Sequence, residues 1–308
     1  MRPEFELLVA CARARLDTAQ ADRVRRLLSE GLDWDVLVPM AHKHGVMPLL
    51  HRGLQGSDAG AVPPSVLNQI RRCFYHHVAC NLFLTDELLR ILDLLEAHGI
   101  EAIPFKGPAL AALLHGDLTL RPFADLDLLI RRQDVPRAKE LLMGQGYRPS
   151  WHLTPLQERV YLRAWCEYVF RGEAGQVVEL HWRLVPRYFV FPLDPEELWE
   201  RLQTMPLQGR PVRTFSPEDW TLILCVHGTK HLWERLRWVV DIADLVSRYP
   251  GMDWEGVLRR ARALGVERMV LLGLGLAQDW LAVPLPVEIA SRIRSDPRVR
   301  ALSAAVEA

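Results

Sequence analysis

The sequence predicts an α+β fold in which a small mixed β-sheet is flanked by helical regions at both ends of the chain. Three observations support this fold class. Apolar residues recur at helical spacing through the first hundred residues and again after Ser216. Between these regions, short strand-like runs alternate with helical ones. The segments CEYVFRG and QVVELHWRL then have the pattern of a β-hairpin, which adds antiparallel strands to the sheet.

Composition places the chain among ordinary globular proteins. Its 308 residues suffice for two compact domains, or for one core with helical extensions. Hydrophobic residues make up 49% of the chain and charged residues 25%. The 38 basic and 38 acidic residues balance, so the chain as a whole has no attraction for polyanions. A nucleic-acid partner would therefore require a local basic stripe.

Cysteine usage and hydropathy indicate a cytoplasmic protein. The five cysteines are dispersed and form no CxxC motif, which is typical of reduced and mostly buried thiols. Charges interrupt the apolar residues near the N-terminus, so no secretion signal is predicted. No apolar run reaches the ~18–20 residues that a membrane span needs. We expect no membrane partner, and the sequence leaves the oligomeric state open.

The chain is predicted to divide into three regions. Residues 1–99 form an N-terminal helical region, whose last helix runs from Ser65 to a glycine at position 99. Residues 100–185 form the α/β core. Residues 186–308 form a C-terminal helical region that completes the cleft of the functional site, and Ser216-Pro217 marks the start of one of its helices.

The most informative stretch is IPFKGPALAALLHGDLTLRPFADLDLLI, residues 103–130. It contains a strand, a Lys106-Gly107 turn, a helix and a second strand that carries Asp125 and Asp127. Two carboxylates two residues apart on a strand share one face. A Lys-Gly turn that opens a helix offers backbone N–H groups and a cation to an anion. A carboxylate pair beside a phosphate-binding turn indicates phosphoryl or nucleotidyl transfer.

A third carboxylate comes from the strand VVELHW, in which Glu179 and His181 share a face. If this strand neighbours the strand of Asp125 and Asp127, three carboxylates converge. Such a group needs cations, because mutual repulsion would otherwise raise the carboxylate pKa values. Two Mg²⁺ ions meet that need and can promote in-line phosphoryl displacement.

Each of these features also has a simpler interpretation. An acidic pair on a strand is also typical of a solvent-facing edge, and Gly107 also suits an ordinary tight turn between strand and helix. Arg121, just before the second strand, either clamps a triphosphate or is a surface arginine. His227 and His231 are four residues apart, but HGTKH lacks the glutamate of the zinc-protease motif, so zinc is not predicted.

Four segments in order, FKGPAL, RPFADLDLLI, VVELHW and HGTKHLWERLRWVVDIADL, resemble an incompletely characterised bacterial family of nucleotidyltransferases. The family belongs to the superfamily with the polymerase-β-like fold, and the resemblance covers most of the chain. It implies a nucleotidyltransferase core within the α+β fold. It also implies Asp125, Asp127 and Glu179 as ligands of Mg²⁺, with Glu179 as a candidate base for the acceptor hydroxyl.

The resemblance further implies nucleotide contacts at Lys106 and Gly107. By the same resemblance, a basic helix beyond the core contacts the triphosphate, with Lys230 as the best candidate and His227 one turn away. One departure concerns the turn, because the superfamily's usual Gly-Ser is here Gly107-Pro108. No serine hydroxyl is therefore present for phosphate at that position.

The expected activity is Mg²⁺-dependent transfer of a nucleoside monophosphate from an NTP such as ATP to a hydroxyl group, with release of pyrophosphate. The neutral net charge favours a small-molecule acceptor. One alternative is a toxin-like enzyme that modifies RNA such as tRNA, with basic stripes drawn from residues 71–73, 131–132 and 258–263. The other is a non-catalytic nucleotide-binding scaffold. The sequence does not identify the acceptor or the preferred NTP.

Overall fold

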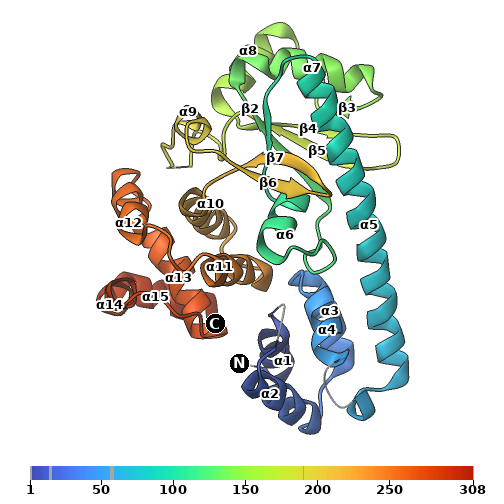
Figure 1. Ribbon diagram of the computed structural model, residues 1–308, viewed down its shortest axis with the longest axis vertical. Coiled ribbons are helices and arrows are strands. Elements are labelled where there is room, and N and C mark those ends of the chain that lie inside the picture. Colours follow the sequence, from blue (N-terminus) through green and yellow to red (C-terminus); the bar gives the residue numbers. More distant parts are fainter. Residues whose placement is uncertain (1, 14–15, 56–58, 190, 308) are drawn as a thin grey trace. The chain divides into compact units, whose positions relative to one another are not determined.

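The computed structural model describes residues 2–13, 16–55, 59–189 and 191–307. These residues form helices, a five-stranded mixed sheet and a two-stranded sheet, so the predicted α+β class is confirmed (Figure 1). None of the helices in these ranges has the length and apolarity needed to cross a membrane.

The chain folds into two compact units that are each discontinuous in sequence. Unit 1 contains residues 1–78, 119–122 and 220–308, and unit 2 contains residues 79–118 and 123–219. The division into regions 1–99, 100–185 and 186–308 stays a prediction. Two helices contribute residues to both units, namely α5 (Pro64–Ala97) and α10 (Pro217–Lys230).

Unit 1 is helical, as expected for the two ends of the chain. Between its N-terminal and C-terminal helices, the N–H of Arg237 donates to the His44 carbonyl at 3.1 Å. Besides parts of α5 and α10, it contains α1 (Pro3–Cys11), α2 (Thr18–Ser29), α3 (Trp34–Lys43), α4 (Met47–Gln55), the short 3₁₀ helix η1 (Ala59–Ala61), α11 (Leu236–Arg248), α12 (Trp254–Ala263), α13 (Glu267–Leu281), α14 (Val287–Ser295) and α15 (Pro297–Glu307).

Unit 2 holds both sheets. Its strands are β1 (Ala102–Pro104), β2 (Asp125–Ile130), β3 (Arg148–Pro149), β4 (Glu167–Arg171), β5 (Val177–His181), β6 (Gln203–Leu207) and β7 (Arg210–Thr214). Its other elements are α6 (Gly107–His115), η2 (Arg132–Asp134), α7 (Val135–Gly144), α8 (Pro155–Ala164) and α9 (Pro195–Trp199). Green and yellow mark most of this unit in Figure 1.

The five-stranded sheet has the order β1-β2-β5-β4-β3. Strands β2 and β5 are parallel, and every other neighbouring pair is antiparallel. One face of the sheet is apolar and buried, because alternate residues of each strand point to the same side. The residues of that face that are 0–1% exposed are Leu126, Leu128, Ile130, Tyr168, Phe170, Val178 and Leu180.

Most of the expected elements are confirmed. The predicted hairpin exists as β4 and β5, and Gly175 adopts a positive φ of 84° in its turn. Strand β2 begins at Asp125, two residues later than the apolar pattern suggests. The helix from residue 64 to 97 is a single element of 34 residues, and the helix predicted after Ser216 begins at Pro217.

The hairpin β6–β7 lies within residues 186–308, for which the sequence pattern predicts a helical region. Its turn is formed by Gln208 and Gly209, both with positive φ (49° and 81°). A two-residue turn of this kind matches the twist of paired strands. Strand β7 contacts β1, so the hairpin packs beside the main sheet. The alternation in TMPL and RPVRT, with glycine in the turn, was the available signal.

A buried ion pair anchors the segment 119–122 within unit 1. Arg121 donates from Nε and Nη2 to the two carboxylate oxygens of Asp241 on α11, at 2.8 and 2.9 Å. Both side chains are at most 5% exposed. Arg237 also donates to the carbonyl of Pro122 at 2.6 Å. Arg121 is therefore a buried structural residue and not the surface arginine that the sequence allowed.

Removing one member of the Arg121–Asp241 pair should destabilise the protein strongly. In Asp241→Asn the buried guanidinium loses its counter-charge, at a cost of about 3–5 kcal/mol. Urea unfolding monitored by circular dichroism measures the change. The double variant Arg121→Met/Asp241→Leu should recover most of the loss. Asp22→Asn, which breaks the exposed Asp22–Arg25 pair, should cost less than about 1 kcal/mol. Equal losses for both single variants would contradict this account.

Asp244, one turn further along α11, should make stability depend on pH. Burial, and next the Asp241 carboxylate, raise the pKa of Asp244 to about 7, although Arg13 opposes the shift. The pKa of this carboxyl in the unfolded chain is near 4, so the folded protein binds the proton more tightly than the unfolded chain does. The stability that comes from the protonated Asp244 is therefore complete below about pH 4 and is lost as pH rises through about 7. The difference in unfolding free energy between Asp244→Asn and the wild type should therefore grow in favour of the variant from pH 4 to pH 8, by up to about 4 kcal/mol.

Chemical denaturation at pH 4, 6 and 8 measures this difference. The matched control is Asp86→Asn on α5, because Asp86 is exposed. Its stability should follow that of the wild type at each pH. Parallel curves for the wild type and Asp244→Asn would show that Asp244 does not control the pH dependence.

Candidate active site

The register of two parallel strands brings the predicted carboxylates together. In the β2–β5 ladder Asp127 lies opposite Glu179, and Asp125 lies opposite Val177. Because side chains alternate along each strand, the three carboxylates lie on the same face of the sheet. This is the face opposite to the apolar core. We call Asp125, Asp127 and Glu179 the acidic cluster.

Strand β5 also carries His181 on this face, next to the acidic cluster. The Nε2 atom of His181 lies 3.2 Å from Asp127 Oδ1 and 3.4 Å from Glu179 Oε2. The ring is only 2% exposed and packs edge-on against Phe105, with centroids 4.8 Å apart. The sequence pattern places His181 beside Glu179 but indicates no role for it.

Glu167 is a further neighbour, which the sequence alone does not indicate. The antiparallel β4–β5 register places Glu167 opposite His181, and Glu167 Oε2 lies 3.2 Å from His181 Nδ1. The signal was the alternation in Glu167–Arg171, in which Tyr168 and Phe170 are buried on the other face. Only the pairing of β4 with β5 could reveal that Glu167 meets this histidine.

Lys106 is bound directly to the acidic cluster. Its Nζ donates to Asp127 Oδ1 at 2.9 Å, and its side chain is 21% exposed. The backbone of Lys106 has φ 61° and ψ −153°, a region occupied almost only by glycine. Such a conformation costs about 1–3 kcal/mol and is found mainly at functional sites. The strained backbone places the lysine at the N-terminus of α6.

Gly107 follows in the same turn, and its lack of a side chain is required there. Its φ is 43°, and a Cβ atom at this position would lie 3.2 Å from the carbonyl oxygen of Asp125. The start of α6 therefore lies against the start of β2. Pro108 at the second helical position fixes φ without losing an intrahelical hydrogen bond.

The charges of this site determine its protonation. Burial alone would raise the pKa of Asp127, but the Lys106 ammonium and His181 outweigh burial and hold that pKa below its ordinary value. Burial opposes charge on His181 as well, yet its hydrogen bonds, first to Asp127, and the Glu167 charge raise its pKa well above the ordinary value. The pKa of Lys106 is likewise raised, because the attraction of Asp127 exceeds the cost of burial.

The donor set fits a divalent cation. One ligand atom each from Asp127, Glu179 and His181 lie within 4.8 Å of one another. The Asp127 side chain is 1% exposed, and its Oδ2 has no hydrogen-bond partner among the described residues. A buried carboxylate oxygen without a partner is costly and calls for an explanation. A bound cation is such an explanation, because carboxylate oxygens are the preferred ligands of hard metal ions.

The remaining predicted residues lie in unit 1. Arg121 is held by Asp241, as described above. Lys230 and His227 both lie on α10 and are half-buried. The His227 and His231 rings are 4.6 Å apart, and the His227 ring packs edge-on against Trp238 with centroids 5.5 Å apart. Nucleotide binding by Arg121, Lys230 and His227 stays a prediction.

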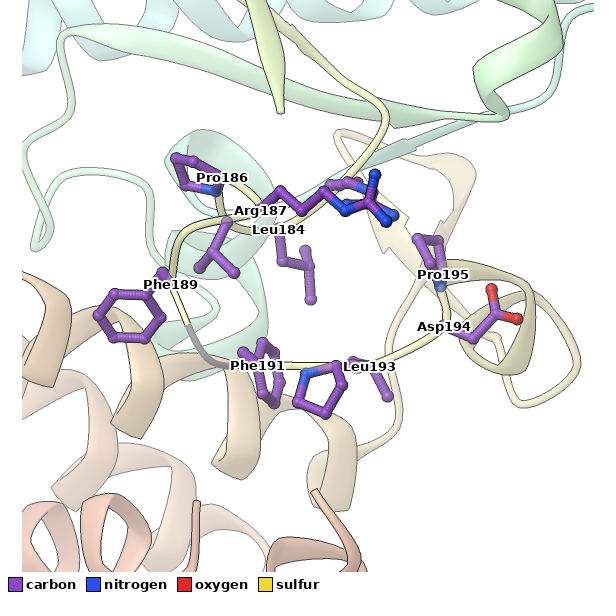
Figure 2. A pocket seen from close by; sticks show the side chains of 11 residues that line it. Leu184, Pro186, Arg187, Phe189, Phe191, Leu193, Asp194 and Pro195 are labelled. Atoms are coloured by element: carbon purple, nitrogen blue, oxygen red, sulfur yellow. The ribbon is translucent and has the colours of Figure 1, made fainter. Parts of the chain in front are cut away.

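A pocket begins two residues after the end of β5. It is formed by residues of the segment 183–195 and has a volume of about 540 Å³. Figure 2 shows side chains that line it, among them Leu184, Phe191 and Leu193, and Arg187 extends along one side. Arg183 is at most about 7 Å along the chain from His181. One end of the pocket lining, at Arg183, is therefore close to His181 in unit 2.

Comparison with solved structures finds nucleotidyltransferases. A lincomycin-bound lincosamide antibiotic adenylyltransferase, LnuA, is 18% identical, with a TM-score of 0.38, over 53% of this chain and 96% of its own. An antigenic nucleotidyltransferase-like protein from Paracoccidioides brasiliensis is 18% identical, with a TM-score of 0.38, over 68% and 94%. The antibiotic-resistance factor ANT(2'')-Ia is 13% identical, with a TM-score of 0.34, over 70% and 95%.

Among curated proteins, none matches the chain significantly. A match to a protein family assigns the chain. Residues 30–282 match the family described as "Uncharacterised nucleotidyltransferase". This range includes both strands of the acidic cluster, the Lys106-Gly107 turn and α10. Since the match covers well over half of the chain, the protein belongs to this nucleotidyltransferase family.

Proposed function

We propose that the protein transfers a nucleoside monophosphate from an NTP to a hydroxyl group of a small molecule and releases pyrophosphate, with Mg²⁺ or a related divalent cation as cofactor. The observation that carries this proposal is the β2–β5 register, which collects Asp125, Asp127 and Glu179 on one face beside a lysine. Family membership supports the same reaction class.

In this proposal Asp125, Asp127 and Glu179 hold the cation. The bound cation supplies the positive charge that activates the attacking hydroxyl and stabilises the leaving oxygen. Glu179 is less buried than Asp127, at 24% side-chain exposure against 1%. It is therefore the carboxylate that an acceptor from solvent can reach. We assign Glu179 the role of general base, which accepts the proton of the acceptor hydroxyl.

The N-terminus of α6 is assigned to the NTP phosphates. The first N–H groups of a helix have no partner within the helix and point toward an anion placed there. Pro108 removes one of these donors, so Gly107 and Lys106 provide the binding that the turn retains. The Lys106 ammonium, which now neutralises Asp127, is close enough to act on phosphate oxygens once a cation takes over that neutralisation.

The pocket formed by residues 183–195 supports a small-molecule acceptor. It is lined both by apolar side chains and by the charged groups of Arg183, Arg187 and Asp194. A concave site that combines apolar contacts with a small number of placed charged groups suits a small polar ligand. The zero formal net charge of the chain gives no comparable support for RNA.

Incubation with each labelled NTP in turn tests this function directly. Purified protein, Mg²⁺ and an α-labelled NTP are combined either with a small-molecule extract of cells or with total RNA. We expect label in the small-molecule fraction and pyrophosphate release. Label confined to RNA would contradict the proposed acceptor class, and no transfer with any NTP would contradict the reaction.

Asp127→Asn should abolish this transfer without unfolding the protein. The substitution preserves shape but removes the charge at the centre of the acidic cluster, so turnover should fall at least about a hundredfold, or roughly 2.7 kcal/mol in transition-state stabilisation. Pyrophosphate release measures turnover, and circular dichroism checks the fold. Asp86→Asn, at an exposed position, is the matched control and should retain full turnover.

Lys106→Gln should weaken NTP binding about 10- to 100-fold, because one charge-assisted hydrogen bond is worth roughly 1.5–3 kcal/mol. Isothermal titration with a non-hydrolysable NTP analogue measures the change. Lys139→Gln is the control, since Lys139 pairs with Glu158 on α8. An analogue affinity that is unchanged in Lys106→Gln would remove Lys106 from the phosphate site.

A further inference from the structure

We propose that His181 is a metal ligand through Nε2, so that the site formed with Asp127 and Glu179 prefers a divalent transition-metal ion over Mg²⁺. The inference deepens the proposed function and rests on its metal site. It assigns a role to a residue that the carboxylate-only scheme leaves unused.

The first support is the position of the imidazole nitrogen. Nε2 lies 3.2 Å from Asp127 Oδ1 and 3.4 Å from Glu179 Oε2. Ligand atoms about 2.1 Å from an octahedral ion are roughly 3.0 Å apart when adjacent. The two separations from Nε2 are therefore close to those that one ion imposes, and the two carboxylate oxygens lie within 4.8 Å of each other.

The second support is the burial of these donors. The side chains of His181 and Asp127 are 2% and 1% exposed. Asp127 Oδ2 has no hydrogen-bond partner in the described part of the chain. Desolvated donors are already held in place, so little freedom is lost when an ion binds. An ion held by both carboxylate oxygens of Asp127 also removes the cost of leaving Oδ2 unsatisfied.

The third support is Glu167, on the other side of the ring. Histidines that ligate metals usually present their second nitrogen to a carboxylate or carbonyl, which fixes the ring and raises its basicity. Glu167 Oε2 lies 3.2 Å from His181 Nδ1, at ion-pair distance but without the alignment of a hydrogen bond. The β4–β5 register keeps Glu167 opposite His181. Nδ1 thus faces the Glu167 carboxylate. Nε2 faces the acidic cluster and releases its proton to solvent when it binds the ion.

The choice of ion follows from the donor types. Mg²⁺ prefers oxygen ligands and keeps several waters, whereas imidazole favours first-row transition metals. A nitrogen ligand among carboxylates makes a mixed set that suits Mn²⁺, Fe²⁺, Co²⁺ or Zn²⁺ better than Mg²⁺. We take Mn²⁺ as the probe, because its electron spin reports directly coordinated nitrogen.

Two other arrangements have to be distinguished from this one. In the first, His181 is only a counter-cation for the carboxylates and never contacts the metal. In the second, the ion sits on the opposite side of the ring, where Cys166, Glu167 and His181 also offer three donors within 4.8 Å. Cys166 is fully buried. The replacement of its sulfur therefore tests this second arrangement.

The experiment is pulsed electron paramagnetic resonance of the metal-stripped full-length protein loaded with Mn²⁺ and no nucleotide. We expect ¹⁴N modulation from one coordinated imidazole, replaced by the ¹⁵N pattern when histidine is isotopically labelled. His181→Asn should abolish the modulation and weaken Mn²⁺ binding at least about tenfold, with a smaller change for Mg²⁺. His152→Asn, at an exposed position, should change neither quantity.

Further variants separate the possible sites. Cys166→Ser should retain the nitrogen coupling. Loss of the coupling in this variant would indicate that the ion binds at Cys166, Glu167 and His181, and would overturn the proposal. Binding of Mn²⁺ without nitrogen coupling, or no binding of Mn²⁺, would also overturn it. Because nucleotide is absent, these results do not depend on turnover. Nucleotidyl transfer without nitrogen coupling would contradict the histidine ligand but leave the proposed function intact. Nitrogen coupling without transfer would support the histidine ligand and contradict the proposed function.

Discussion

The parallel pairing of β2 with β5 is the constraint on which the site depends. A strand displays every second side chain on a given face, so a shift of one residue in register would send Glu179 and His181 to the apolar side. Such a shift would bury a carboxylate among Leu126, Leu128 and Phe170, which are 0% exposed. The apolar core therefore enforces the register, and the register in turn places Asp127 beside Glu179.

Charge balance is the second organising feature of unit 2. Like charges this close raise each other's pKa values unless cations are present. Here Lys106 and His181 provide the compensating charge, and both contact Asp127 Oδ1. The price is a lysine backbone in a region normally restricted to glycine. This placement of Lys106 is consistent with a site in which the acidic cluster binds a metal ion and the Lys106 ammonium contacts phosphate.

Unit 1 shows how polar residues of a motif can have structural roles. In HGTKHLW, Gly228 has no side chain because the Trp233 ring packs where a Cβ would lie, at 2.4 Å. Leu232 and Trp233 both adopt positive φ in the turn that separates α10 from α11. Arg121 and Asp241, which lie 120 residues apart in sequence, form one buried pair. These contacts account for part of the sequence pattern without any reference to a ligand.

The sequence by itself determined the elements whose signals are local. Period-two alternation marked β2, β4 and β5, the Ser216-Pro217 pair marked the start of α10, and the Asp125-Leu126-Asp127 spacing placed two carboxylates on one face. The tertiary structure alone decided which strands are neighbours, and hence that Glu167 meets His181 and that Lys106 meets Asp127. The physical reason is that strand order and register depend on burying apolar side chains from distant segments together, and no window of the sequence contains that information.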